Sequence, residues 1–153
     1  MKVAGYRDGV PFDLSLSYIG HDARGGHAML SEEASSAYLL MAMAASKAGH
    51  ELVVNSAWRS NDHQRRLYSF WESAKMRWDK GDPLTRGPRP LRPSRPGHSP
   101  HESGNAVDID VFEAGKPRPV VAWLKAHAAE YGFRATVPQE PWHYEFVGAR
   151  ETS

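Results

Sequence analysis

Two short motifs in the second half of the chain constrain its fold and chemistry more than any other feature. The first, SPHESGNAVD, ends at Asp108, and the second, EPWH, runs from Glu140 to His143. Together they provide two imidazoles, His101 and His143, and one carboxylate, Asp108, that could bind a metal ion. Three protein ligands leave one position of a tetrahedral zinc ion open, as in catalytic zinc sites. Glu140 is a further carboxylate that could take a proton from water bound to such a metal.

Both motifs adjoin segments in which apolar and polar residues alternate. Ala106–Val111 and Trp142–Val147 each show a period of two, which is typical of a strand with one buried side. If these strands pair, Asp108 and His143 come close on one surface. His101 precedes the first strand in a segment that its glycines and proline are expected to keep flexible, so that it could bend back over the same spot.

The pattern Ser-x-His-x-x-Gly-x-Ala-x-Asp, followed by Glu-x-Trp-His, resembles the zinc D-alanyl-D-alanine carboxypeptidase family typified by VanY and VanX (peptidase family M15). Phage L-alanyl-D-glutamate endolysins are in the same superfamily. Ser56–Ser60 with Gln64, and Trp123–Phe133, resemble further family segments in the same order. The chain departs from the usual pattern at Ala57-Trp58, where Gly-Tyr is usual, and at Pro100, which stiffens the ligand segment.

The resemblance implies a role for each of these motif residues. The implied zinc ligands are His101, Asp108 and His143. The implied catalytic residues are Glu140, as general base, and Arg59, facing the scissile carbonyl or a substrate carboxylate. The implied substrate contacts are Arg59, Gln64, Ser99 and Trp142. Asp110 and Glu145 share faces with the ligands and either orient a ligand histidine or are solvated acids.

The expected elements indicate one α+β domain over residues 1–153. Residues 1–30 are expected to be largely irregular, with a short strand or two around Val10 to Ile19. A buried strand is predicted at Glu51–Asn55. Helices are predicted from the N-cap Ser31 to about Lys47, over Asp62–Lys80, and over Pro119–Glu130. The resemblance implies a small, mainly antiparallel sheet with helices packed on it, the hedgehog/DD-peptidase type of fold.

Residues 82–97 form a segment rich in proline and arginine for which no regular structure is expected. Its arginines are Arg86, Arg89, Arg92 and Arg95. Three interpretations remain open: a solvated loop, a site for anionic wall polymer or stem-peptide carboxylates, or a nucleic-acid contact. The last is disfavoured, because no aromatic residues are interleaved with the arginines and the net charge of the chain is only +1.

Composition excludes several other classes of protein. The chain has no cysteine, which excludes disulfides and thiolate zinc sites. Its longest apolar stretch, Ala37–Ala45, is far shorter than the roughly 20 residues of a membrane span. The first residues lack the apolar segment of a signal peptide. The protein is therefore expected to accumulate in the cytoplasm and to reach the cell wall by phage-type or secretion-system release, unless the sequence is a trimmed form. It is expected to be a monomer.

The expected function is a zinc-dependent hydrolase that cleaves a peptide bond in peptidoglycan stem peptides. The D-Ala–D-Ala and L-Ala–D-Glu bonds both remain open as the bond that is cut. Two alternatives lie outside this enzyme class: a cell-wall-binding module without turnover, and a signalling domain in which zinc is structural. Glu140 argues against the first, and the open coordination position together with Arg59 argues against the second.

Overall fold

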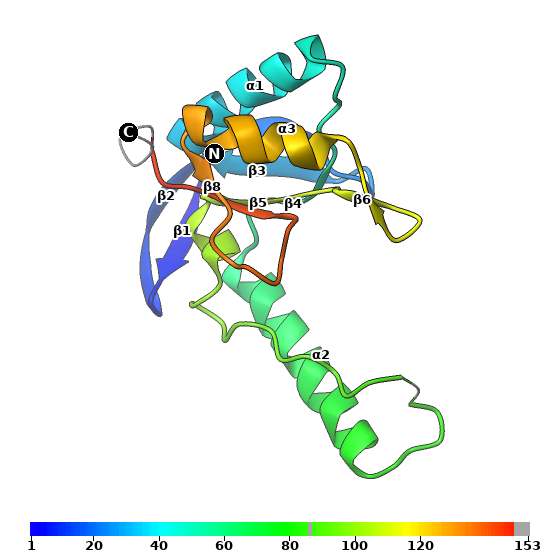
Figure 1. Ribbon diagram of the computed structural model, residues 1–153. Coiled ribbons are helices and arrows are strands. Elements are labelled where there is room, and N and C mark those ends of the chain that lie inside the picture. Colours follow the sequence, from blue (N-terminus) through cyan, green and yellow to red (C-terminus); the bar gives the residue numbers. More distant parts are fainter. Residues whose placement is uncertain (86, 149–153) are drawn as a thin grey trace.

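The computed structural model describes residues 1–85 and 87–148 and has a mixed α+β fold, as predicted (Figure 1). The helices are α1 (Glu32–Lys47), α2 (Asn61–Asp79) and α3 (Val120–His127), with the short 3₁₀ helices η1 (Pro100–Ser103) and η2 (Ala128–Tyr131). The strands are β1 (Lys2–Arg7), β2 (Val10–His21), β3 (His27–Ser31), β4 (Val54–Ser56), β5 (Ala106–Ile109), β6 (Phe112–Glu113), β7 (Lys116–Pro117), β8 (Phe133–Arg134) and β9 (His143–Phe146).

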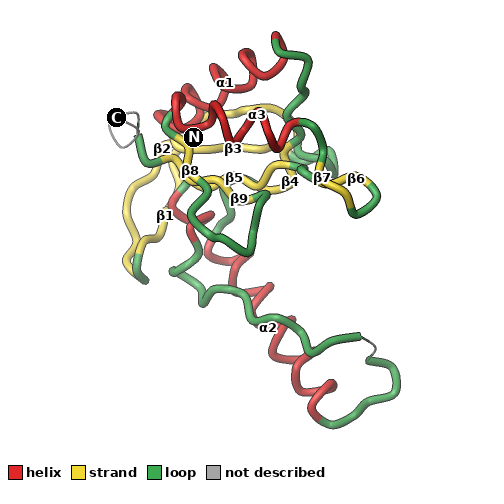
Figure 2. Tube along the Cα trace, in the orientation of Figure 1, coloured by secondary structure: helices red, strands yellow, loops and turns green. Residues whose placement is uncertain are grey.

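Within the described residues, all strand pairs are antiparallel and form three small sheets. The orders are β1-β2-β3, β4-β5-β9-β8 and β6-β7. Figure 2 shows α1 and α3 on one side of the strands, while α2 projects away from the other side. The core lies between the strands and helices α1 and α3. Its most deeply buried members include Leu30, Met41, Ile109, Leu124 and Phe133.

The prediction that residues 1–30 are largely irregular was wrong. They form a three-stranded sheet whose first hairpin turns at Asp8 and Gly9, both with positive φ, so that Arg7 pairs with Val10. Asp-Gly is a favoured pair for such a two-residue turn, because the turn requires positive φ at both positions. The hairpin signal was therefore present in the sequence, but the high glycine content obscured it.

The other predicted elements form, with shifted ends. α1 and α2 begin and end within one residue of the predicted bounds, with Ser31 and Ser60 as their N-caps. The strand predicted at Glu51–Asn55 is instead Val54–Ser56, because the partner strand β5 ends at Ile109, which pairs with Val54. The third predicted helix ends early and continues as η2.

The proline- and arginine-rich segment contains no helix or strand over 82–85 and 87–97, as predicted; Arg86 lies outside the described residues. Across residues 1–85 and 87–148, none of the helices has both the length and the apolar character needed to cross a bilayer.

Candidate metal centre and active site

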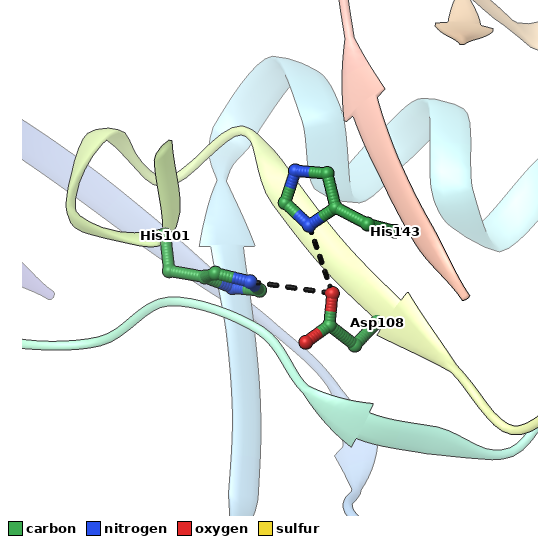
Figure 3. A group of neighbouring side chains, drawn as sticks. All are labelled: His101, Asp108 and His143. Carbon is green, nitrogen blue, oxygen red and sulfur yellow. Dashed lines mark hydrogen bonds and ion pairs between the residues drawn. The ribbon is translucent and has the colours of Figure 1, made fainter. Parts of the chain in front are cut away.

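The two motifs bring three potential metal ligands together (Figure 3). Asp108 in β5 lies directly opposite His143 in β9, and η1 delivers His101 to the same place. The Oδ1 atom of Asp108 is 2.9 Å from Nδ1 of His143 and 3.3 Å from Nε2 of His101. One ligand atom from each of the three residues lies within 4.8 Å of the others. The cluster therefore offers two nitrogens and one oxygen as donors to a metal ion.

The outward-facing ring nitrogens fix the orientation of both imidazoles. Nδ1 of His101 donates to the carbonyl oxygen of Ala57 at 2.8 Å, and Nε2 of His143 donates to Glu145 at 3.1 Å. Glu145 is in turn hydrogen bonded by Thr136. Metal-binding histidines commonly use the second nitrogen in this way, which directs the lone pair of the first nitrogen at the metal. The donor set therefore fits a zinc ion.

The electrostatics of the cluster also favour a cation. Burial works against a charged Asp108, but its hydrogen bonds with His101 and His143 lower its pKa to about 2. Burial likewise disfavours a charged His143, yet its contacts with Asp108 and Glu145 outweigh that effect and raise its pKa to about 9. Positive charge between the carboxylates is thus stabilised. Of the two acids left open above, Glu145 contacts the candidate ligand His143, whereas Asp110 pairs with Arg118 at 3.2 Å.

The segment that carries His101 is anchored by buried hydrogen bonds, whereas the sequence predicted a loosely held loop. Glu102, which is fully buried, accepts hydrogen bonds from the backbone nitrogens of Gly97 and Ser99 and from the side chain of Asn61. Ser99 caps η1 by accepting from the nitrogen of His101 at 3.3 Å. Sequence reasoning missed Glu102, although Ser-x-x-Glu is the capping-box pattern that could have identified it.

Replacing Glu102 with alanine should therefore lower the free energy of unfolding by about 3 kcal/mol, because each buried donor left unpaired costs about 1–3 kcal/mol. Zinc affinity should fall as well, since the position of His101 depends on this anchor. Chemical denaturation and metal titration would measure both effects. The exposed Glu113 provides the control as Glu113→Ala. If Glu102→Ala is as stable as this control, the anchoring role is wrong.

A cavity of about 310 Å³ opens beside the three candidate ligands and contains most of the predicted site residues. Its lining includes Arg59, Gln64, Ser99, His101, Asp108, Glu140 and His143. Arg92, Pro93 and Ser94 of the proline- and arginine-rich segment also line it. Sequence reasoning did not place these three residues at the site. Trp142 is outside this lining, and its ring packs edge-on against Phe112.

Arg59 is held in a defined orientation within the cavity. Its guanidinium donates to Gln64 at 2.9 Å and to Ser56 at 3.2 Å. Burial lowers the pKa of Arg59, while Asp108 and Glu102 act in the opposite direction. The side-chain amide of Gln64 makes two hydrogen bonds. Its oxygen accepts from Arg59, and its nitrogen donates to the carbonyl of Ser94 at 2.7 Å. Gln64 thus links Arg59 to the segment that forms one wall of the cavity.

With this geometry established, comparison with known proteins identifies the family. The chain matches the VanY family, D-alanyl-D-alanine carboxypeptidase, over residues 27–149. The chain belongs to the VanY family. The putative carboxypeptidase YodJ of Bacillus subtilis (strain 168) is 30% identical over a 140-residue alignment that covers 79% of this chain and 47% of YodJ. The chain thus spans about half the length of this curated relative.

Solved structures share the VanY-type fold. VanYB in complex with D-alanine-D-alanine aligns with a TM-score of 0.69 at 21% identity, covering 96% of this chain and 87% of VanYB. The E175A mutant of the D,D-pentapeptidase VanY with Zn(II) aligns with a TM-score of 0.65 at 22% identity. The alignment covers 92% of this chain and 83% of the VanY chain. The LD-carboxypeptidase LdcB aligns with a TM-score of 0.63 at 29% identity. The alignment covers 81% of this chain and 62% of the LdcB chain.

Proposed function

We propose that the chain is a zinc-dependent D,D-carboxypeptidase that acts on peptidoglycan stem peptides. The observation that carries this proposal is the convergence of His101, Asp108 and His143 beside a cavity that also contains Glu140 and Arg59. Membership of the VanY family supports the reaction. The Zn(II) named for one fold neighbour, and the D-alanine-D-alanine named for another, support the metal and the substrate.

The metal ligands, Glu140 and Arg59 would each have a separate role in the proposed hydrolysis. A zinc ion held by the three ligands would supply Lewis acidity and activate a water molecule at neutral pH. Glu140 lines the same cavity and would take the proton from the attacking water and pass it to the leaving amine. The guanidinium of Arg59 would hold the terminal carboxylate of the substrate or the developing oxyanion, for which its planar fork is suited.

Mass analysis of products from a purified stem pentapeptide tests the proposal. A D,D-carboxypeptidase releases one terminal D-alanine and leaves a tetrapeptide. Cleavage between L-Ala and D-Glu would instead show an endopeptidase of the endolysin type. The likeness to LdcB favours a second candidate, an L,D-carboxypeptidase, which would leave the pentapeptide intact and shorten a tetrapeptide. Binding without any product would indicate a wall-binding module.

Arginine at position 59 should not be replaceable by lysine. Arg59→Lys keeps the positive charge but loses the fork that Gln64 and Ser56 hold. Since misplacing a group by about 1 Å can cost on the order of 10²-fold, both Arg59→Lys and Arg59→Ala should lose about that much kcat/KM. A loss confined to KM would assign Arg59 to binding of the substrate carboxylate, and a loss in kcat to the transition state. Near-normal kcat/KM for Arg59→Lys would show that charge alone suffices.

A further inference from the structure

Helix α2 projects from the body of the protein, and the chain returns along it (Figures 1 and 2). We call residues 87–95 of the returning chain the strap. Among the residues of α2, only Gln64 is buried, so the helix contributes little to the core. Its aromatic residues hold the strap instead. Trp71 and Trp78 donate their indole N–H groups to the carbonyls of Pro90 and Gly87, each at 3.2 Å.

Further contacts fix the two ends of the strap. Near the catalytic cavity, Gln64 donates to the carbonyl of Ser94 at 2.7 Å. Toward the far end of α2, Arg89 pairs with Asp79 at 3.1 Å. The strap is therefore tied to α2 along its length, which distinguishes it from a freely solvated loop. It forms a fixed wall that α2 holds beside the cavity.

A groove of about 570 Å³ lies between α2 and this wall. Its lining residues are Tyr68, Trp71, Glu72, Lys75, Met76, Asp79, Lys80, Arg92 and Arg95. Four of these side chains are cationic and two are acidic. Asp79 is already paired with Arg89 and Lys75. In residues 1–85 and 87–148, no carboxylate lies within ion-pair distance of Arg92 or Arg95, so the groove presents an excess of positive charge.

Arg92 is held in place by aromatic rings. Its guanidinium carbon lies 5.7 Å from the ring centre of Tyr68 and 5.8 Å from that of Trp71, within the range of cation–π interactions. The rings thus orient a guanidinium whose N–H edges remain able to bind an anion. Because Arg92 lies over both rings, the groove is better suited to pairing with charge than to stacking a sugar or a base.

The groove adjoins the catalytic cavity at Arg92. Arg92 lines both, and its neighbours Pro93 and Ser94 line the cavity. A peptide that places its C-terminal residues between Arg59 and the metal ligands must extend its remaining residues out of the cavity. Three extended residues span roughly 10 Å. A side chain or carboxylate that far from the cut bond can therefore reach past the strap.

We propose that the groove between α2 and the strap is an extended substrate site that binds a carboxylate on the acyl side of the cut bond, with Arg92 and Arg95 as its partners. This proposal rests on the peptidase function proposed above. It makes α2 and the strap the part of the chain that distinguishes anionic stem peptides from neutral ones.

Two pentapeptides test this site. They both end in D-Ala-D-Ala and differ only in a glutamyl residue near the N-terminus, which carries either a free carboxylate or its amide. The wild-type chain should cleave the carboxylate form with about tenfold higher kcat/KM, as expected for one charge-assisted hydrogen bond in a partly exposed site. In Arg92→Gln/Arg95→Gln this ratio should fall close to one. The matched control, Arg66→Gln/Arg77→Gln, removes the same charge from α2 outside the groove and should keep the ratio.

Binding of the two peptides to the Glu140→Ala chain, measured by calorimetry, separates this proposal from the proposed function. One outcome is that the wild type cleaves neither peptide while the carboxylate form still binds about tenfold more tightly through Arg92 and Arg95. That result would support the groove as a carboxylate site and would show that the peptidase assignment is wrong. A wild-type ratio near one in both assays would overturn the groove. A ratio that persists in Arg92→Gln/Arg95→Gln, or collapses equally in the control, would also overturn it.

Discussion

Replacing Glu140 with alanine should lower kcat by about 10²–10⁴-fold, the range for loss of a general acid–base group, while zinc binding and folding persist. Glu140 lines the cavity beside the three candidate ligands but is not one of them. Its loss therefore removes the proton carrier and leaves the metal site intact. Steady-state kinetics on a D-Ala-D-Ala peptide, with metal analysis of the same preparation, would measure both effects.

Glu130→Ala is the matched control, since Glu130 is an exposed acid that pairs with His127 and does not line the cavity. It should retain wild-type turnover. If Glu140→Ala remains within a few-fold of wild type, the base lies elsewhere, and Glu145, which touches His143, becomes the next candidate.

Replacing His143 with alanine should abolish both zinc binding at micromolar concentrations and turnover. Loss of a partner outside the ligand set costs metal affinity roughly 10–100-fold, and loss of a ligand should cost more. The change also leaves Asp108 and Glu145 facing each other without the imidazole between them. Zinc should stabilise the wild type by about 4 kcal/mol when its free concentration is about a thousand times Kd, but should not stabilise the variant.

Thermal unfolding with and without zinc, together with metal analysis, tests this expectation. His127→Ala removes a half-exposed imidazole that lies outside the candidate metal cluster, where it pairs with Glu130 and packs against Trp123, and the variant should bind zinc as the wild type does. A His143→Ala protein that still carries one equivalent of zinc would show that the metal is held by other residues.

The sequence alone identified most, but not all, of the residues of the candidate site. The period-two alternation around Asp108 and around His143 places each on a defined strand face. The two motifs added His101 and Glu140, and the family resemblance added Arg59. Local signals also located α1 and α2, because a serine N-cap and the residues that end a helix act over only a few positions. The same kind of signal at Asp8-Gly9 marked a hairpin that glycine content concealed.

Only the tertiary structure decided how these pieces meet. Asp108 faces His143 because β5 and β9 pair in one register, and a slip of one residue would turn either side chain to the opposite face. Glu102 anchors the His101 segment through Asn61, and Gln64 ties the strap to α2 through Ser94. These partners are far apart in the chain, so no local pattern predicts them. Their contacts depend on which buried donors and acceptors the folded chain brings together, because each must find a partner once it leaves water.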